Sequence, residues 1–428
     1  MREKLKVVEN FISMRYLKKF KTREQLEKYQ KKMLVQQMKH IKANSEYFKN
    51  IKADSIEDFK ELPLMDKKIM MENFNKLNCV GIDRDKALAI AINGEKSRNF
   101  DEKLNNISVG LSSGTSGARG LFIISDEERA LWAGGVLAKF LPKGNILGHK
   151  IAFFLRADNN LYETIDSKAI KFRYFDIMKD MNENMETLNE YQPTIIVAPP
   201  SVLLLLAEAQ EKKKINVNPV KIISVAEVLT NEDEKYFKKA FKLKIVHQAY
   251  QCTEGFLGYV CECGNFHINE DVIYIEKEYI DKERFVPIIT DFLRKSQPII
   301  RYRLNDILVE DKKKCSCGSP TMVIKKIEGR EDDIFIFKGI KEKEIIVFPD
   351  FISRCVIYAK GIKNYKVVQE DKDNITVYLD NINEKIKKQI NNEFKTLSER
   401  MKFVCPNIKF EKYEFNLSRK MKRVERKK

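Results

Sequence analysis

The sequence predicts an α/β fold, with a large N-terminal domain of layered, mostly parallel sheets and helices and a small α+β C-terminal domain. The chain has 428 residues, of which 43% are hydrophobic, enough for two or three packed domains. From about residue 105, short β-rich runs alternate with helical patterns, which is typical of buried parallel strands. After Asp332 the pattern changes to a shorter α+β section.

Residues 1–60 predict helices, because apolar positions such as Leu26 and Met33 recur among charged residues until Pro63. The β-rich runs that follow are "GLFIIS", "KIAFFL", "PTIIVAPP", "KIISVAE" and "LKIVHQAY". Helical segments such as "SVLLLLAEAQEKKK" and "NEDEKYFKKAF" separate them. This alternation is the signature of strands joined by crossover helices.

Strand-rich pieces beyond residue 268, such as "DVIYIEKEYI" and "RFVPIITDF", predict a small β-subdomain over about 268–325. We assign this β-subdomain to a large domain over residues 1–331. The small domain at 332–428 contains the strand patterns "NYKVVQE" and "NITVYL" and the helix pattern "INEKIKKQINNEFKTLSERM". We therefore place the domain boundary near Asp332.

The formal net charge of +17 could attract nucleic acid, anionic lipid or an anionic small molecule. The basic residues are spread along the chain, which favours a solvated surface over a specific nucleic-acid site. No stretch reaches the roughly 18 to 20 apolar residues of a membrane span, and the start lacks a signal-peptide core, so we expect a cytoplasmic protein without membrane association. The eight cysteines should then stay reduced.

The run "LSSGTSGARG", residues 111–120, combines glycines with hydroxyl side chains and one cation, the groups that hold a phosphate well. It is not a Walker-type loop, because no lysine followed by Ser or Thr closes it. Alone, it could equally be a surface turn. The candidate phosphate-binding residues are Ser112, Ser113, Gly114, Thr115, Ser116, Gly117, Arg119 and Gly120.

Cysteine and histidine residues form C-x-C-x3-H at 261–267 and C-x-C at 315–317. Four soft ligands of this kind could close a tetrahedral structural zinc site. The favoured set is Cys261, His267, Cys315 and Cys317, with Cys263 as a replacement for Cys261. The alternative is a group of core thiols without metal.

"SSGTSGARG" resembles the phosphate-binding signature of the adenylate-forming superfamily, which contains acyl- and aryl-CoA synthetases and peptide-synthetase adenylation domains. "YQCTEG" resembles the family's aromatic-x-x-Thr-Glu motif, which implies that Thr253 contacts the α-phosphate and Glu254 holds magnesium. "SVAE" is similar to the segment beside the adenine. The resemblance thus implies that Ala226, Glu227 and Tyr250 bind the nucleotide.

"PIIRYRLNDI" resembles the Tyr-Arg-x-Gly-Asp motif, which implies that Asp306 receives the ribose hydroxyls. Asn305 replaces the family glycine, and asparagine also tolerates left-handed backbone angles. "IEGREDDIF" resembles the hinge motif, with Arg330 near the nucleotide and Asp332 as the pivot of a mobile lid domain.

The family's catalytic lysine lies near the C-terminus after a glycine. Here "LSRKMKRVERKK" offers Lys420 in the best register and Lys422 as the alternative, with Arg419 in the place of the glycine. A basic tail alone would be read as a solvated chain end.

"ECGNFHINEDVIYIE" and "CSCGSPTMVIKKIEGREDD" resemble the phenylacetate-CoA ligase branch. "RADNNLYE" and "YQCTEGFLGYVCECG" resemble its subgroup with indoleacetate-lysine ligase and coenzyme F synthetase-related proteins. The resemblance implies a ligase that uses ATP and Mg²⁺ to turn a small carboxylic acid, with aromatic acids among the candidates, into an acyl adenylate.

The acceptor is either an amine or the thiol of coenzyme A, and the protein is either a monomer or a homodimer without a specific nucleic-acid partner. The competing hypothesis is a basic, zinc-stabilised nucleic-acid-binding protein without catalysis, which the net charge and the cysteines suggest.

Overall fold

The computed structural model describes residues 2–427 except 98, 100, 113–119, 145, 156–169, 342, 358, 360, 363 and 415–419. The chain divides into two compact units. The first contains Met1–Leu304 and Glu310–Lys325, and the second contains Asn305–Val309 and Lys326–Lys428. The predicted boundary before Asp332 and the predicted β-subdomain stay predictions.

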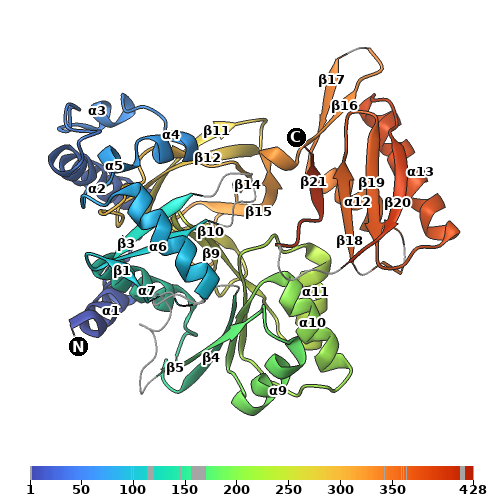
Figure 1. Ribbon diagram of the computed structural model, residues 1–428, viewed down its shortest axis with the longest axis horizontal. Helices are drawn as coiled ribbons and strands as arrows, with labels where there is room; N and C mark the ends of the chain where they lie inside the picture. Colours follow the sequence, from blue (N-terminus) through green and yellow to red (C-terminus); the bar gives the residue numbers. More distant parts are fainter. Residues whose placement is uncertain are drawn as a thin grey trace. The chain divides into compact units, whose positions relative to one another are not determined.

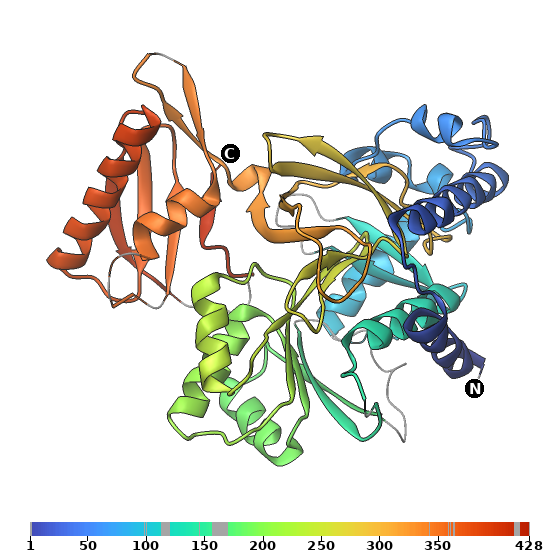
Figure 2. The ribbon, with the colours of Figure 1, turned by 180° about the vertical axis from the view of Figure 1, so that it is seen from behind.

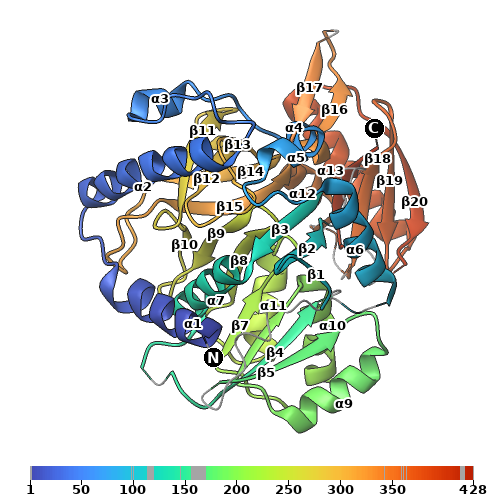
Figure 3. The same ribbon diagram turned by 60° about the vertical axis from the view of Figure 1, so that its left-hand side comes forward.

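The start of the first unit is helical, as the sequence predicts. Its helices are α1 (Arg2–Ile12), the π-helix η1 (Ser13–Leu17), α2 (Arg23–Asn44), α3 (Ile56–Lys60), α4 (Lys67–Glu72), α5 (Phe74–Leu77) and α6 (Arg84–Ser97). Figure 3 shows α1 alongside α7 (Asp126–Phe140). Glycine makes this close packing feasible, because a Cβ at Gly134 would lie 2.6 Å from the carbonyl oxygen of Val7.

A three-stranded antiparallel sheet follows, made of β1 (Lys103–Leu104), β2 (Ile107–Leu111) and β3 (Leu121–Ser125). Helix α6 packs against it through a core that includes Ala87, Ala91 and Ile123 (Figure 3). The sequence analysis grouped "GLFIIS", which contains β3, with the parallel strands. In the structure β3 instead pairs antiparallel with β2. A connection as short as residues 112–120 joins antiparallel neighbours, because a parallel pair needs a longer crossover.

The large sheet contains the predicted parallel strands in the order β8-β7-β6-β4-β5. Their bounds are His149–Leu155 for β4, Ile170–Asp176 for β5, Ile195–Ala198 for β6, Lys221–Ser224 for β7 and His247–Cys252 for β8. Every residue of β6 and β7 is buried, as expected for parallel strands covered on both faces. Helices α9 (Met181–Tyr191), α10 (Pro200–Glu211) and α11 (Asn231–Ala240) accompany these strands (green in Figures 1 and 2).

Antiparallel strands extend this sheet from β8. They begin with β9 (Gly255–Val260) and β10 (Phe266–Ile268), and β10 pairs in turn with the start of β15 (Val323–Arg330). The long hairpin of β11 (Ile273–Tyr279) and β12 (Arg284–Asp291) carries the short β13 (Tyr302–Arg303). Strands β14 (Asp306–Asp311) and β15 each run from one unit into the other.

The second unit has the predicted α+β character. A hairpin of β16 (Phe335–Lys338) and β17 (Glu344–Val347) precedes a four-stranded sheet with the order β20-β19-β18-β21. The strands of the sheet are β18 (Tyr365–Gln369), β19 (Asn374–Leu379), β20 (Asn407–Lys412) and β21 (Val424–Arg426). Helices α12 (Pro349–Ile357) and α13 (Glu384–Met401) contribute Ile352, Ile390 and Phe394 to its buried core.

No helix in the part of the chain that the structure describes has both the length and the apolar character needed to cross a bilayer.

Candidate active site

The glycine- and serine-rich loop begins and ends at two residues that hold each other. The backbone N–H of Ser112 donates to the carbonyl of Gly120 at 2.7 Å, and the backbone N–H of Gly120 donates to Ser112 Oγ at 2.8 Å. The hairpin of β2 and β3 thus fixes the base of the loop. The other predicted phosphate-binding residues lie outside the described residues: Ser113, Gly114, Thr115, Ser116, Gly117 and Arg119.

Thr253 and Glu254 occupy the turn between β8 and β9. Thr253 Oγ1 donates to Glu254 Oε2 at 2.9 Å, and Arg294 Nη1 donates to the carbonyl of Thr253 at 2.8 Å. Gly255 follows with φ +156°, and a Cβ there would lie 2.6 Å from Asp291 Oδ2. Only glycine therefore lets the turn approach the segment that carries Arg294.

One pocket in the first unit brings these two motifs together. Its lining includes the described loop residues Ser112 and Gly120 as well as Thr253 and Glu254. The two motifs are far apart in the sequence, so their convergence is a property of the fold. The lining thus combines the base of the glycine- and serine-rich loop with a carboxylate, and carboxylate oxygens are ligands that suit a divalent cation.

Four polar residues of this pocket were not foreseen: Lys67, Arg294, Gln297 and Tyr302. Tyr302 lies within the quoted "PIIRYRLNDI" motif, so the motif could have indicated it. Arg294 and Gln297 stand just before this motif, in the string "FVPIITDFLRKSQPIIRYRLNDI", which also resembles the subgroup, whereas the segment around Lys67 carries no functional signal.

Tyr302 places its hydroxyl beside Glu254. Burial, followed by the negative charge of Glu254 and a hydrogen bond to it, raises the pKa of Tyr302 above its ordinary value. The phenol therefore keeps its proton at neutral pH. Two hydroxyl groups, from Thr253 and Tyr302, orient the carboxylate of Glu254.

A buried carboxylate at the start of α7 binds the two residues that follow Arg294. Glu128 accepts hydrogen bonds from the backbone N–H of Lys295 at 2.6 Å and from Ser296 Oγ at 2.5 Å. Burial opposes ionisation of Glu128, but the charge of Arg294 and these hydrogen bonds hold its pKa below the ordinary value. The ionised Glu128 thus keeps the segment that lines the pocket in place.

The segment after β7 leaves the sheet at the same edge as the Thr253–Glu254 turn, because β7 and β8 are parallel neighbours. In parallel α/β sheets, ligands bind at the carboxyl ends of the strands. Ala226 lies in this segment with φ +67°. Glu227 accepts hydrogen bonds from the backbone N–H and Oγ of Ser201, each at 3.1 Å, and so caps α10. Tyr250 is buried in β8.

The predicted ribose and hinge residues gather in the second unit. Arg330 Nε lies 3.5 Å from Asp306 Oδ1, and Asn305 Nδ2 donates to Asp332 Oδ2 at 3.1 Å. Lys420 is half-buried in this unit, whereas Arg419 lies outside the described residues.

Lys422, the alternative catalytic lysine, has a clear partner. Its Nζ forms an ion pair of 2.9 Å with Asp333 Oδ1, and the side chain of Asp333 is only 10% exposed. Burial raises the pKa of Asp333, and the charge of Lys422 opposes this rise. Lys422 therefore neutralises a largely buried carboxylate of the second unit.

Comparison with solved structures identifies this architecture. A 2-hydroxyisobutyryl-CoA ligase bound to an acyl adenylate superimposes with a TM-score of 0.72 over 94% of this chain and 90% of that chain, at 16% identity. The chain has the fold of the adenylate-forming ligases. An amide bond synthetase from Marinactinospora thermotolerans, 10% identical, superimposes with a TM-score of 0.54 over 73% of this chain and 66% of that chain.

A curated relative supports the same group of ligases. The indoleacetate–lysine synthetase of Pseudomonas savastanoi is 26% identical over 168 residues, which are 38% of this chain and 40% of that protein. The match thus spans well under half of the relative. No family model matches the sequence.

The second candidate site is the cysteine–histidine group, which the fold brings together as the favoured set. One ligand atom from each of Cys261, His267, Cys315 and Cys317 lies within 4.8 Å of the others. The Sγ atoms of Cys261 and Cys315 are 3.7 Å apart, and Cys317 Sγ is 3.5 Å from His267 Nε2. Two sulfurs bound tetrahedrally to zinc at about 2.3 Å would be about 3.8 Å apart, so the donors fit zinc. Cys263 is exposed.

Backbone and side-chain donors surround these thiols. The backbone N–H of Cys317 donates to Cys315 Sγ at 3.4 Å, and Asn265 Nδ2 donates to the same sulfur at 3.0 Å. Such bonds stabilise sulfur that carries negative charge. None of the eight cysteines forms a disulfide bond.

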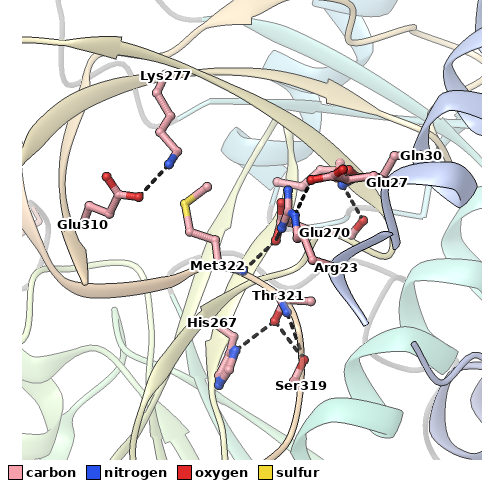
Figure 4. Close-up of polar contacts among 11 residues, drawn as sticks. Arg23, Glu27, Gln30, His267, Glu270, Lys277, Glu310, Ser319, Thr321 and Met322 are labelled. Atoms are coloured by element: carbon pink, nitrogen blue, oxygen red, sulfur yellow. Dashed lines mark hydrogen bonds and ion pairs between the residues drawn. The ribbon is translucent and has the colours of Figure 1, made fainter. Parts of the chain in front are cut away.

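A chain of contacts connects His267 to helix α2 (Figure 4). His267 Nδ1 lies 2.8 Å from Thr321 Oγ1, which directs Nε2 toward the cysteines. The backbone N–H of Met322 donates to Glu270 Oε2 at 2.6 Å, and Arg23 Nη1 binds the same oxygen at 2.7 Å. Burial lowers the pKa of His267 to about 4, so the imidazole is neutral, as a metal ligand must be.

Proposed function

We propose that this protein is an ATP-dependent, AMP-forming ligase that activates a small carboxylic acid and transfers its acyl group to an amine or to coenzyme A. The observation that carries the proposal is the pocket shared by Ser112, Gly120, Thr253 and Glu254. The fold agrees with it, because the similar structures are ligases that contain or form acyl adenylates.

In the proposed first step, a carboxylate oxygen of the acid attacks the α-phosphorus of ATP. The bond to the bridging oxygen breaks, and pyrophosphate leaves. The loop from Ser112 to Gly120 would hold the β- and γ-phosphates, and Thr253 would bind the α-phosphate. Glu254 would hold Mg²⁺, which supplies positive charge to the phosphates when bound.

In the second step, an amine nitrogen or a thiol sulfur attacks the acyl carbon, and AMP leaves. Asp306 would bind the ribose, Ala226, Glu227 and Tyr250 would border the adenine, and Arg330 and Lys420 would complete the site. A lysine of the second unit must reach ATP, so we propose that a hinge at Asp332 moves this unit during the reaction.

The proposal has two versions, which differ in whether the acceptor of the acyl group is an amine or coenzyme A. The indoleacetate–lysine synthetase and the amide bond synthetase favour an amine. The 2-hydroxyisobutyryl-CoA ligase favours coenzyme A. Coenzyme A is therefore tested beside amines.

The test is acid-dependent exchange of labelled pyrophosphate into ATP, screened over a library of small aliphatic and aromatic acids. We expect exchange with a subset of acids and none without acid. AMP formation on addition of coenzyme A, lysine or other amines then identifies the acceptor. The absence of exchange together with salt-sensitive retention of DNA or RNA on filters would contradict the proposal and favour the nucleic-acid-binding alternative.

We further propose that Cys261, His267, Cys315 and Cys317 hold a structural zinc ion. Cys261 follows β9, His267 lies in β10, and Cys315 and Cys317 lie in the loop before β15. Zinc would therefore tie together two segments that are distant in sequence. The ligands proposed for zinc differ from the carboxylate proposed for magnesium at the Thr–Glu turn. Thiolates and imidazole select zinc, whereas carboxylates select magnesium.

The purified protein is expected to contain about one zinc per chain by metal analysis. Removal of the metal by a chelator should lower the melting temperature by at least about 5 °C, because structural zinc contributes directly to folding free energy. Cys261→Ser should lower both zinc content and melting temperature. The matched control is Cys263→Ser, which removes an exposed thiol two positions along and should change neither. Protein purified without zinc and with unchanged stability would contradict the site.

A further inference from the structure

The segment that leads into β13 turns sharply just before Tyr302. Ile299 and Tyr302 both line the pocket that contains Thr253 and Glu254. In an extended chain, residues three positions apart face opposite sides, so the backbone must turn between these two. Arg301 makes this turn, because its backbone is left-handed with φ +42°. That conformation costs free energy for a residue that carries a Cβ.

Backbone hydrogen bonds hold Arg301 in place on both sides. Its N–H donates to Thr290 Oγ1 at 2.9 Å, and its carbonyl accepts a hydrogen bond from the N–H of Met65 at 3.0 Å. Thr290 is buried in β12, and the carbonyl of Met65 accepts the N–H of Arg303 at 2.8 Å. The turn is therefore fixed between β12 and the segment before α4.

The side chain of Arg301 is anchored as well. Its guanidinium donates two hydrogen bonds to Glu276 of β11, from Nε at 3.0 Å and from Nη2 at 2.8 Å. Nη1 donates to the carbonyls of Lys60 and Leu62, at 2.7 and 2.5 Å, where α3 ends. The side chain is only 17% exposed. These charge-assisted hydrogen bonds offset the cost of the left-handed backbone.

The anchored turn determines where the next side chain points. Tyr302 is buried, and its hydroxyl forms a hydrogen bond with Glu254. We infer that Arg301 is a positioning residue, which aims the Tyr302 hydroxyl at Glu254 and so orients the carboxylate proposed to bind magnesium. The inference rests on the proposed function and adds to it a residue that lies outside the pocket lining.

The test measures the Mg²⁺-dependent gain in ATP affinity, which is the ratio of the Kd without Mg²⁺ to the Kd at saturating Mg²⁺. Titration calorimetry of the full chain gives both values and requires no knowledge of the acid. Arg301→Ala should reduce the gain by about 10-fold, a usual effect of removing a group that orients a metal ligand. Arg301→Gly should retain most of the gain, because glycine adopts φ +42° without strain. The affinity for ATP without Mg²⁺ should not change in either variant.

Tyr302→Phe tests whether Arg301 acts through the phenol. This variant should itself reduce the gain by about 10-fold. In its background, Arg301→Ala and Arg301→Gly should show equal gains, because the hydroxyl that Arg301 positions is absent. A difference between them that persists in this background would overturn the inference.

The matched control is Glu278→Ala. Glu278 accepts two similar hydrogen bonds from Arg303, from Nε at 2.9 Å and from Nη2 at 2.6 Å, but its side chain is 47% exposed. The gain in ATP affinity should therefore stay at the wild-type value. Thermal melting checks the fold of each variant. If Arg301→Ala does not fold, Glu276→Gln weakens the same anchor and should lose part of the gain.

The outcomes separate the inference from the proposed function. An unchanged gain in Arg301→Ala or in Glu276→Gln, or equal losses in Arg301→Ala and Arg301→Gly, would overturn the inference and leave the proposed function standing. A wild-type protein that neither binds ATP in a Mg²⁺-dependent manner nor exchanges pyrophosphate would overturn both.

Discussion

Glu254→Gln is expected to lose acid-dependent pyrophosphate exchange by at least about 100-fold, because a ligand of the cation that neutralises the phosphates would be replaced by a neutral amide. The substitution keeps the size and the acceptor oxygen of the side chain. Thr253 Oγ1 and the Tyr302 hydroxyl can therefore still donate to position 254. The melting temperature should be close to that of the wild type, which separates loss of metal binding from loss of fold.

The control for this variant is Glu283→Gln, an exposed glutamate of the first unit that pairs with Lys325 at the surface. Its exchange rate should equal that of the wild type. A higher Mg²⁺ concentration should recover part of the exchange in Glu254→Gln, since weaker metal binding is partly offset by mass action. Full activity of Glu254→Gln at ordinary Mg²⁺ concentration would remove Glu254 as the magnesium ligand.

Lys420→Ala is expected to slow adenylate formation by about 100-fold or more, because the positive charge that meets the attacking carboxylate and the α-phosphate would be lost. In the second half-reaction the new bond forms at the acyl carbon, and no carboxylate attacks phosphorus. Attack of the acceptor on a preformed acyl adenylate should therefore change much less. The measurement compares pyrophosphate release with AMP release from the isolated adenylate.

Lys422→Ala is the matched comparison, since this lysine stands two positions away and pairs with Asp333. Its removal leaves a buried carboxylate without its cation, so the variant should melt at a lower temperature. It should retain most of the adenylation activity per folded molecule. Equal slowing of both half-reactions in Lys420→Ala, or loss of adenylation mainly in Lys422→Ala, would move the catalytic assignment away from Lys420.

Much of the fold could be predicted because its determinants are local. Runs such as Ile195–Ala198 and Lys221–Ser224 are centred on isoleucine and valine, which favour strands, and the alternation with helices indicated their parallel arrangement. Strand β3 shows where local patterns are insufficient. Its composition resembles that of the buried parallel strands, but the shortness of the loop before it decides its antiparallel pairing with β2.

Some residues of the candidate site could be predicted from the sequence and others could not. Thr253 and Glu254 stand in "YQCTEG", which resembles a motif of the adenylate-forming superfamily, so the sequence indicated them directly. Lys67 carries no such signal, because a single lysine at the start of a short helix is common in a chain with 79 Lys and Arg. Its proximity to Gly120 results from contacts of α4 with β13 and β3, which no local pattern encodes.

By itself, the sequence determined the α/β class, the order of the motifs and the residue types available for phosphate, magnesium and zinc, because composition and periodicity are properties of neighbouring residues. Only the tertiary structure decided which of these residues meet. It brought Ser112 and Gly120 into one pocket with Thr253 and Glu254, and it placed Cys261 rather than Cys263 with the other three soft ligands. Such contacts between distant segments depend on how all strands and helices pack together, and this packing is set by the whole chain.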